Sequence, residues 1–444
     1  MPRRYFGTDG IRGRVGSDPM TVDFALRLAS AAAQVLVPDG GKVLIGKDTR
    51  VSGYMFESAL EAGFVAAGVD VLLTGPLPTP AIAYLTNTTG SDFGIVISAS
   101  HNPYFDNGIK FFDGEGRKLS DETEAAIEAL IGNPPRTCDS SALGRATTLT
   151  TARTDYMRFC RASLPEGMDL DGLKIVIDAS HGAAYKVAPR LMADLGADVI
   201  PVGCSPNGRN INDGVGSTRP DLLRLTVSGV RAHVGIALDG DGDRVVMVDE
   251  RGEIVDGDGL LYILAADMRE RKALKGPVVG TVMSNLGLEL ALEGLGIEFR
   301  RARVGDRQVL AMLKEEGGIL GGETSGHLLC LDKTTTGDGL ITALQILSVM
   351  RRTGRSLSEL AAGMKRLPQI LLNVRIAERV DPGGNDSIVA AVRSTESKLD
   401  GRGRVVLRAS GTEPVIRVMV EGEDEDLVRR LAESLADSVR QAVG

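Results

Sequence analysis

The chain contains 444 residues, more than one ordinary folding core accommodates, and at about 150 residues per domain its length predicts three or four domains. The net charge is −8 and the sequence has no dense run of lysine or arginine. A negatively charged protein of this kind would repel the phosphate backbone of DNA or RNA, so nucleic acid is not an expected partner. The four cysteines form no Cys-x-x-Cys pair, which argues against a disulfide framework and against a thiolate metal site. No signal-peptide stretch opens the sequence and no run of about 18 apolar residues occurs, so a membrane partner is not expected. Together these features favour a cytoplasmic protein.

Three segments of the chain repeat one pattern of strand, loop, helix, glycine stop and second strand. The paired strands are expected at residues 42–46 and 67–75, at 174–178 and 195–203, and at 277–280 and 295–299. Buried apolar strands that alternate with helices are typical of α/β units with mainly parallel sheets, in which ligands bind beyond the carboxyl ends of the strands. The predicted fold class is therefore α/β, with three similar α/β domains built on mixed, mainly parallel sheets.

An apolar, strand-like run at residues 94–98 leads into a polar loop that contains Ser100. Pro103 disfavours a helical backbone just before it, so this loop presents its side chains. Most such serines only form turns. A hydrolase triad is the sharper alternative, but the chain has no Gly-x-Ser-x-Gly elbow, and the adjacent His101 would point away from Ser100 in an extended segment. A serine that accepts a phosphoryl group needs charge neutralisation more than a triad, so Ser100 becomes a candidate for that role if a cation lies nearby.

Three carboxylates occur close together farther along the chain, at Asp239, Asp241 and Asp243. Because they share one parity, an extended backbone aims all three to one side, and the glycines between them let the chain curl around an ion. Oxygen ligands of this kind suit Mg²⁺. A solvated acidic turn is the alternative, but clustered carboxylates repel one another unless a cation is present, so the loop predicts a metal site.

The same three carboxylates, together with Glu250, also match the ligand spacing of a calcium-binding helix-loop-helix. The sixth position of that loop requires glycine for its sharp turn, whereas this chain has Arg244 there. The flanking residues 233–238 and 245–248 are apolar runs typical of strands. A calcium-binding helix-loop-helix is therefore not expected.

A short glycine-flanked loop carries polar side chains at alternating positions. These are Glu323, Ser325 and His327. At this spacing their polar groups could hydrogen-bond successive hydroxyl groups of a sugar. The pattern is weak by itself and gains weight beside a phosphoryl-accepting serine.

From about residue 367 the pattern changes to alternating strands, expected at residues 371–376 and 415–420. Acidic residues 423–426 then introduce a final helix, where they suit the helix dipole. Its apolar stripe consists of Leu427, Leu431, Leu435 and Val439. These elements predict a smaller α+β domain at the C-terminus. The four predicted domains cover residues 1–152, 153–254, 255–366 and 367–444.

The loop at residues 408–412 gathers a guanidinium group, two hydroxyl groups and a glycine, and Arg417 follows on the next strand. Arginine forks and glycine-permitted backbone N–H groups match the geometry of a phosphate. An ordinary β-turn with surface arginines is the alternative, which the pattern alone leaves open.

Five motifs, taken in order, resemble those of the α-D-phosphohexomutases. They lie at residues 6–13, 98–103, 239–244, 322–327 and 408–412, so the resemblance spans nearly the whole chain. Within that family, the segments at 7–13, 106–112, 331–339 and 408–414 are most similar to the bacterial enzymes that act on glucosamine phosphate. The resemblance implies a four-domain enzyme with its active site in a central cleft. It also implies conversion of glucosamine 6-phosphate into glucosamine 1-phosphate on the route to UDP-N-acetylglucosamine, and a homodimer.

The resemblance assigns roles to individual residues as well. Ser100 is the phosphorylated residue, and its phosphoryl oxygen binds Mg²⁺ together with Asp239, Asp241 and Asp243. The sugar is bound by the loop that contains Glu323, Ser325 and His327. The non-reacting phosphate is held by Arg408, Ser410, Gly411, Thr412 and Arg417. The reacting end of the cleft is lined by Arg12, His101, Lys110 and Arg244.

In the expected reaction, the phosphoserine gives its phosphoryl group to O1 of the 6-phosphosugar. The resulting sugar 1,6-bisphosphate, both intermediate and activator, turns over in the cleft before O6 returns a phosphoryl group to Ser100. We expect Lys110 to act as general base and acid, with its pKa lowered by cationic neighbours such as Arg12, and His101 is the alternative. The fourth domain is expected to close over the substrate and exclude water.

Three alternative functions stay open. Glucose or mannose phosphates could be the substrate, because contacts from Glu323 and Ser325 to hydroxyl groups do not obviously recognise the amino group at C2. A sugar-phosphate-binding protein without turnover belongs to a different class, and replacement of Ser100 by alanine separates it from an enzyme. A metal-dependent phosphatase is the third alternative, which net release of inorganic phosphate would support.

Overall fold

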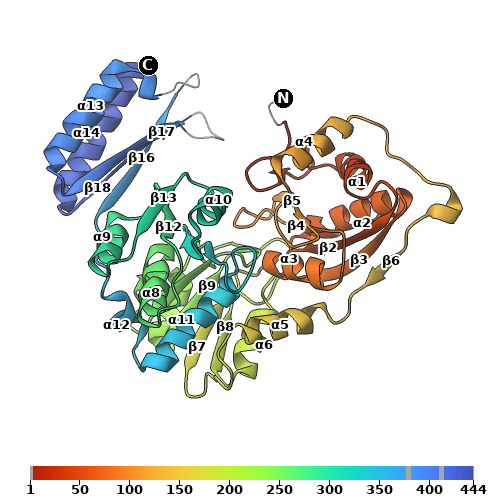
Figure 1. Cartoon of the computed structure of the whole chain (residues 1–444), viewed down its shortest axis with the longest axis horizontal. Coiled ribbons are helices and arrows are strands. Elements are labelled where there is room, and N and C mark those ends of the chain that lie inside the picture. The colour runs from red at the N-terminus through yellow and green to blue at the C-terminus, as the bar shows by residue number, and fades with distance from the viewer. Residues whose placement is uncertain (1–3, 377–381, 410–414, 444) are drawn as a thin grey trace.

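The computed structural model describes residues 4–376, 382–409 and 415–443, which form four domains in chain order (Figure 1). Each domain is built on one sheet, of six, five, four and three strands respectively. The predicted fold class is confirmed, because the first three sheets contain parallel strands connected by helices, whereas the last is smaller and antiparallel. No helix within the described residues is long and apolar enough to span a membrane.

The first sheet has the order β1-β5-β4-β2-β3-β6, in which β2 runs parallel to both β3 and β4. Every residue of β4 is buried, as the predicted apolar run indicates, and β4 delivers the chain into the loop that contains Ser100. The strands are β1 (Ile11–Arg14), β2 (Gly41–Lys47), β3 (Val69–Pro76), β4 (Phe93–Ile97), β5 (Asp106–Asp113) and β6 (Ala146–Thr148). The helices are α1 (Val22–Leu36), α2 (Val51–Ala66), α3 (Thr79–Thr88), α4 (Asp121–Leu130) and the short 3₁₀ turn η1 (Ser140–Ala142).

The second sheet follows the connecting helix α5 (Ala152–Ala162) and has the order β11-β10-β9-β7-β8. Here β7 runs parallel to β8 and β9, whereas β9 and β10 form an antiparallel hairpin whose turn carries the three aspartates. The elements are β7 (Lys174–Asp178), α6 (Val187–Asp194), β8 (Asp198–Val202), α7 (Asp221–Val230), β9 (Val234–Leu238), β10 (Val245–Asp249) and β11 (Ile254–Val255).

The third sheet has the order β13-β12-β14-β15, with β12 parallel to β13 and β14. An antiparallel pair, β14 and β15, holds the predicted sugar-binding loop between them. The elements are α8 (Gly257–Glu270), β12 (Val278–Thr281), α9 (Leu286–Gly294), β13 (Phe299–Ala302), α10 (Asp306–Glu316), β14 (Leu320–Gly322), β15 (Leu328–Cys330), α11 (Gly339–Thr353) and α12 (Leu357–Ala361).

The fourth sheet has the order β16-β18-β17 and is antiparallel throughout. Of the predicted apolar stripe of the last helix, Leu431, Leu435 and Val439 are buried and Leu427 packs partly buried beside them. The elements are β16 (Gln369–Arg375), the 3₁₀ turn η2 (Pro382–Gly384), α13 (Asp386–Leu399), β17 (Gly403–Ala409), β18 (Val415–Gly422) and α14 (Glu425–Val443).

The apolar cores divide the molecule unevenly. One continuous cluster joins the first three domains, with Phe112 from the first, Ile175 from the second and Leu288 from the third among its buried members. Among the described residues, the buried cluster of the fourth domain has its members between Val374 and Val439. The first domain also has a separate buried cluster that includes Phe24 and Ile97. The first three domains are therefore joined through a shared core, in which the fourth domain takes no part.

Candidate active site

Ser100 lies in the loop after β4, at the junction of the first and second domains. Its backbone is left-handed, with a φ of 50°, and the residue is 1 % exposed. The hydroxyl Oγ donates a hydrogen bond to Asp239 Oδ2 at 2.6 Å. The structure therefore joins the predicted phosphoryl acceptor directly to the predicted metal loop, although 139 positions separate them in the sequence.

The expectation that His101 points away from Ser100 is wrong. An extended segment would place the two neighbouring side chains on opposite sides, but the left-handed backbone of Ser100 brings His101 Nδ1 to 3.3 Å from its Oγ. Burial, followed by the positive charges of Arg244 and Arg12, lowers the pKa of His101 to about 4. The imidazole is therefore neutral near pH 7 and lies beside the serine hydroxyl.

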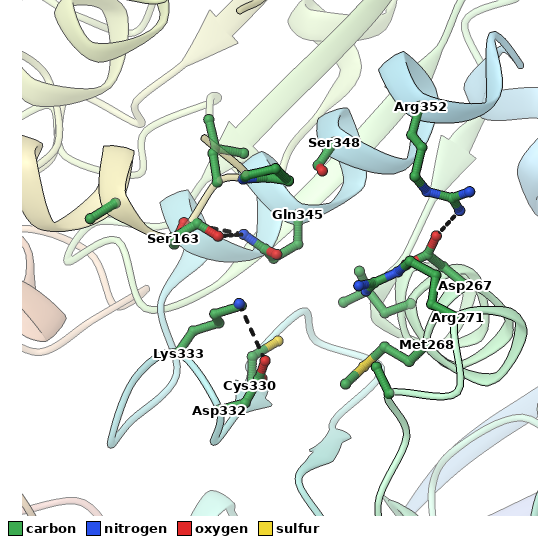
Figure 2. A pocket seen from close by; sticks show the side chains of 15 residues that line it. Ser163, Asp267, Met268, Arg271, Cys330, Asp332, Lys333, Gln345, Ser348 and Arg352 are labelled. Atoms are coloured by element: carbon green, nitrogen blue, oxygen red, sulfur yellow. Dashed lines mark hydrogen bonds and ion pairs between the residues drawn. The ribbon is translucent and has the colours of Figure 1, made fainter. Parts of the chain in front are cut away.

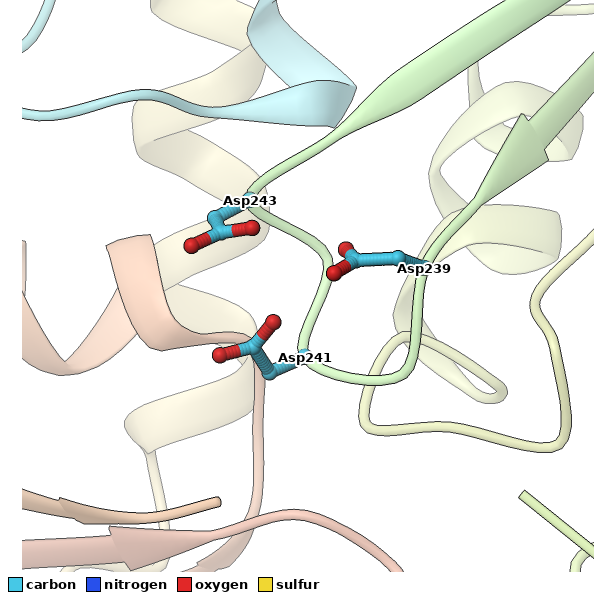
Figure 3. Close-up of side chains that lie close together, drawn as sticks. All are labelled: Asp239, Asp241 and Asp243. Carbon is cyan, nitrogen blue, oxygen red and sulfur yellow. The ribbon is translucent and has the colours of Figure 1, made fainter. Parts of the chain in front are cut away.

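The three aspartates lie in the turn between β9 and β10, where Gly242 adopts a φ of 72°. Figure 3 shows their carboxylates turned towards one another, and one oxygen from each lies within 4.8 Å of the others. All three residues are buried, and among the described residues Asp241 Oδ1 and Asp243 Oδ1 have no hydrogen-bond donor. Buried carboxylate oxygens without donors are costly to desolvate, so this set of oxygens fits a divalent cation such as Mg²⁺.

The carboxylates of this loop differ in their affinity for protons. Burial, followed by repulsion from Asp243 and Asp241, raises the pKa of Asp239 well above its usual range. Burial also opposes ionisation of Asp243, but the charges of Lys110 and His327 more than offset it and hold the pKa of Asp243 below its usual range. Mutual repulsion of this kind is relieved when a cation binds, which is a second reason for a metal at this loop.

The expectation that cationic neighbours lower the pKa of Lys110 is also wrong. Lys110 Nζ lies 2.8 Å from Asp241 Oδ2, 3.0 Å from Asp9 Oδ2 and 3.5 Å from Asp243 Oδ2. Burial alone would lower the pKa of Lys110, and Arg12 does so slightly, but the three carboxylates raise it above its usual value. The ammonium group is therefore a fixed positive charge at the edge of the metal loop.

His327 also contacts the metal loop. Its Nδ1 lies 3.7 Å from Asp243 Oδ2, and its Nε2 lies 3.6 Å from Asp306 Oδ2. Burial lowers the pKa of His327, but these two carboxylates raise it to about 9 overall, so the imidazole is charged near pH 7. The sequence pattern grouped His327 with the sugar-binding side chains, and the structure places it between two carboxylates of different domains.

A cleft of about 430 Å³ opens where the first three domains meet, a size typical of small-molecule sites. Its lining residues are Tyr5, Gly7, Thr8, Asp9, Gly10, Arg12, Asp243, Arg244, Val304, Gly305, Asp306, Glu323 and His327. Glu323 Oε1 accepts a hydrogen bond from the Gly305 N–H at 3.1 Å, and Ser325 is exposed in the same loop. The predicted residues Arg12, Arg244, Glu323 and His327 are thus brought together along one cleft.

Groups outside the predicted set complete this site. Lys118 Nζ donates to Asp9 Oδ1 at 2.6 Å and also pairs with Asp306, which links the first domain to the third. Thr79 Oγ1 donates to Asp241 Oδ2 at 2.7 Å. Asp9 lies within the N-terminal motif and could have been found from it, whereas the other residues belong to no local pattern.

The predicted phosphate-binding residues belong to the fourth domain. Arg408 on β17 and Arg417 on β18 lie directly opposite each other in antiparallel register. Burial, followed by repulsion from Arg417, lowers the pKa of Arg408. A bound anion would offset this repulsion between the two guanidinium groups. Ser410, Gly411 and Thr412 lie outside the described residues. In Figure 1 the end of β17 lies on the side of the fourth domain that faces the first domain.

A second cavity, of about 290 Å³, lies between α5, α8 and α11 (Figure 2). Its buried carboxylate, Asp267, already pairs with Arg271 at 2.7 Å and with Arg352. Lys333 lies 3.4 Å from Asp332 at the other side. The described residues that line this cavity include none of the predicted site residues, so it is separate from the predicted chemistry.

Four family models match the chain in order. Their descriptions are phosphoglucomutase/phosphomannomutase alpha/beta/alpha domain I at residues 3–136, domain II at residues 155–252, domain III at residues 256–367, and the C-terminal domain at residues 371–438. The matched segments together cover most of the chain.

Similar proteins match over their full length. The chain is 55 % identical over 443 residues to a phosphoglucosamine mutase of Aeromonas hydrophila subsp. hydrophila, with 100 % of both chains covered. It is 56 % identical over 444 residues to a phosphoglucosamine mutase of Methylococcus capsulatus, covering 100 % of this chain and 99 % of that one. Its fold is similar to that of Aspergillus fumigatus N-acetylphosphoglucosamine mutase in complex with GlcNAc-6P and magnesium, with a TM-score of 0.71, 18 % identity, and 99 % and 96 % of the two chains covered.

Proposed function

The chain belongs to the phosphoglucomutase/phosphomannomutase family, the α-D-phosphohexomutases, and we propose that it is a phosphoglucosamine mutase. In this function it is an isomerase that interconverts glucosamine 6-phosphate and glucosamine 1-phosphate. The reaction passes through a phosphoserine enzyme and a sugar 1,6-bisphosphate, and its product serves the synthesis of UDP-N-acetylglucosamine. Identity of 55 % to a relative of that name over its full length supports the amino-sugar substrate.

One observation carries this proposal more than any other: Ser100 Oγ lies 2.6 Å from Asp239 Oδ2, inside a buried cluster of carboxylates. A neutral serine needs no such surroundings. A phosphoryl group on Ser100, by contrast, would bring negative charge against this cluster, and that charge is tolerable only with a cation between them. The geometry therefore suits a serine that carries a phosphoryl group beside a divalent metal ion.

The proposed metal is Mg²⁺, held by Asp239, Asp241 and Asp243 together with an oxygen of the phosphorylated Ser100. The buried carboxylate oxygens that lack donors among the described residues support this ligand set. When bound, the ion supplies Lewis-acid polarisation of the phosphoryl oxygens and neutralises their charge.

The proposed reacting end carries four groups around Ser100. Arg12 and Arg244 line the cleft as cations, and Lys110 Nζ is held by carboxylates from two domains. Positive charges fixed in this way stabilise a phosphoryl group in transfer without further reorganisation. His101 Nδ1, 3.3 Å from Ser100 Oγ, is close enough to exchange a proton with a hydroxyl at that position.

The other end of the substrate is assigned to the third and fourth domains. We propose that Glu323, Ser325 and His327 bind the sugar. The non-reacting phosphate is assigned to Arg408, Ser410, Gly411, Thr412 and Arg417. Because the two ends of the intermediate exchange places, one clamp of this kind serves both half-reactions. Closure of the fourth domain would keep water from the phosphoserine during that exchange.

We further propose a cytoplasmic enzyme that acts on small phosphosugars and forms a homodimer. Four free cysteines, Cys138, Cys160, Cys204 and Cys330, suit a reducing compartment. The substrate class follows from the family, in which the relatives are named for phosphosugars.

The test follows purified protein with Mg²⁺, glucosamine 6-phosphate and a trace of sugar 1,6-bisphosphate by phosphorus NMR. Glucose 6-phosphate competes in the same tube. We expect glucosamine 1-phosphate to appear preferentially, without free phosphate. Preference for the glucose substrate would reassign the enzyme as a phosphoglucomutase or phosphomannomutase, and net phosphate release would indicate a phosphatase.

A further inference from the structure

The backbone around Ser100 is strained on both sides of a domain boundary. Ser100 of the first domain has a φ of 50°, and in the second domain Ser180, His181 and Asn212 have φ values of 50°, 50° and 59°. Asparagine and histidine tolerate this region better than other residues do, but a serine such as Ser100 or Ser180 rarely adopts it unless the surroundings enforce it, and such strain concentrates at functional sites. Specific contacts must therefore hold Ser100 in its left-handed conformation.

Two side chains hold the Ser100 loop from opposite sides of that boundary. Asn212 Nδ2 donates to the carbonyl oxygens of both Ser100 and Asn102, at 3.0 Å each. Arg50 Nη2 donates to the same two oxygens, at 3.2 Å and 2.5 Å. We call this set of four hydrogen bonds the loop clamp. It satisfies two carbonyl groups that a left-handed residue would otherwise leave unpaired.

The loop clamp is itself fixed in place. Arg50 is fully buried and pairs with the equally buried Asp48. The backbone N–H of Asn212 donates to the carbonyl of Ser180 at 2.9 Å. Both donors therefore have little freedom to follow the loop if it moves.

The metal loop packs directly against the loop clamp. A Cβ atom added to Gly240 would lie 2.6 Å from the carbonyl oxygen of Ser100 and 2.7 Å from Asn212 Nδ2. Only glycine fits at so close an approach. Gly240 directly follows Asp239, the residue that accepts the hydrogen bond of Ser100 Oγ. The clamp thus controls the position of the serine relative to the metal ligands.

We propose that Asn212 and Arg50 are positioning residues for phosphoryl transfer, which keep Ser100 in its left-handed conformation so that Oγ faces the carboxylates. This inference rests on the proposed function, because it concerns the residue that carries the phosphoryl group. Neither side chain lines the cleft, so they act through the loop. Asn212 is the more informative of the two, since it reaches the loop from the other domain.

Loss of the Asn212 amide should affect the chemical step and leave substrate binding nearly intact. In Asn212→Ala, the two carbonyl groups keep only Arg50, and the loop relaxes away from the strained conformation. A displacement of about 1 Å at reacting atoms reduces turnover by roughly 100-fold. In Asn212→Asp, a carboxylate faces two carbonyl oxygens, so the loss of turnover should be larger still.

The experiment measures kcat and KM for glucosamine 6-phosphate in wild type, Asn212→Ala and Asn212→Asp, with thermal unfolding to verify folding. We expect kcat to fall and KM to change little. Asn210→Ala is the matched control, because Asn210 lies in the same loop and bonds to Ser205 and Asn207 nearby. Wild-type kcat in folded Asn212→Ala, or a loss confined to KM, would overturn the inference.

A crystal structure of Asn212→Ala supplies a readout that does not depend on activity. We expect Ser100 to leave the left-handed region and its Oγ to lose the hydrogen bond to Asp239. An unchanged Ser100 would overturn the clamp even if activity were reduced. Absence of mutase activity in the wild-type enzyme would instead overturn the proposed function. The crystal structure of Asn212→Ala would still show whether the loop clamp holds Ser100 in its left-handed conformation. Arg50→Lys alters a buried ion pair and would disturb folding as well as the loop, so the test relies on Asn212.

Discussion

The proposed reacting end of the cleft and the proposed phosphate-binding end are held by opposite kinds of structure. At the reacting end, Ser100, Asp239 and Lys110 are buried and come from two domains that share one apolar core. At the other end, Arg408 and Arg417 belong to a domain whose buried cluster is its own. Phosphoryl transfer requires fixed geometry, whereas gripping and releasing a substrate requires movement, and the division of the core matches that difference.

Polar bonds around Glu421 and Arg404 connect the third and fourth domains. Glu421, fully buried, accepts hydrogen bonds from two groups of the third domain, the Leu286 N–H at 3.2 Å and Asn285 Nδ2 at 3.4 Å. Arg404 of the fourth domain donates to the carbonyl oxygens of Val282 at 3.0 Å and Ser284 at 2.6 Å. Two domains that are joined by a small group of hydrogen bonds can rotate about that group more readily than two domains whose apolar side chains interdigitate. We therefore expect the fourth domain to turn about Glu421 and Arg404.

Asp239→Asn should produce the most severe loss at the reacting end. The amide cannot neutralise a divalent cation, and we expect kcat/KM to fall roughly 10³-fold, with a matching loss of Mg²⁺ affinity in titration calorimetry. Because burial and repulsion from Asp243 and Asp241 disfavour the charged form of Asp239, the same variant should unfold at a higher temperature without Mg²⁺. Asp249→Asn, at the far end of the same hairpin, is the control. Full activity in Asp239→Asn would exclude this residue as a metal ligand.

Leu435→Ala tests whether the fourth domain folds on a separate core. Removal of a buried leucine side chain costs about 2–5 kcal/mol of stability. We expect the rate of backbone amide hydrogen exchange to increase in the fourth domain alone. The matched variant is Leu344→Ala, at a fully buried position of the shared core, which should quicken exchange in the third domain and its neighbours instead. Identical exchange patterns for the two variants would contradict the separation of the cores.

Arg408→Ala should weaken the grip on the non-reacting phosphate. A charge-assisted hydrogen bond contributes about 1.5–3 kcal/mol, so KM should rise about 10- to 100-fold. The effect on kcat should be smaller, because that phosphate is bound in both the ground state and the transition state. Arg402→Ala, exposed in the same domain, is the control. A fall in kcat alone would place Arg408 at the reacting end.

The shared core contains a buried carboxyl group whose titration should be measurable. Burial raises the pKa of Asp338 to about 6, and its carboxylate accepts a hydrogen bond from Tyr156 Oη at 2.9 Å. Between about pH 4 and pH 6 the native state binds more protons at this site than the unfolded state does, so the free energy of unfolding falls as pH rises, by at most about 3 kcal/mol. In Asp338→Asn this contribution should be absent from denaturant titrations across the same window. Equal pH dependence in both proteins would show that Asp338 is not the titrating group.

Local patterns predicted most of the architecture. The repeated strand, helix and glycine stop indicated three α/β domains, because buried parallel strands impose a continuous apolar run on the sequence. Ser100 and the three aspartates, which the structure brings together, could be singled out because each group lies within one short motif. The apolar stripe through Leu431, Leu435 and Val439 predicted the last helix for the same reason.

Long-range contacts and backbone strain escaped prediction. Lys110 was expected to lose its proton readily, but Asp9 and Asp241 reach it from distant parts of the chain and have the opposite effect. The positive φ of Ser100, which turns His101 towards it, has no signature in a residue that is not glycine. Asn212 likewise belongs to no pattern, because its significance arises only when two domains meet.

The most direct test of the central claim follows an isotopically labelled phosphoryl group from Ser100. Enzyme phosphorylated with ¹⁸O-labelled phosphoryl is mixed with Mg²⁺ and glucosamine 6-phosphate, and mass spectrometry locates the label in protein and sugar. We expect the label to start on Ser100 and to appear in sugar bisphosphate and then in glucosamine phosphates, with Ser100→Ala carrying none. Label on another residue, or label released only as inorganic phosphate, would contradict a phosphoserine mutase.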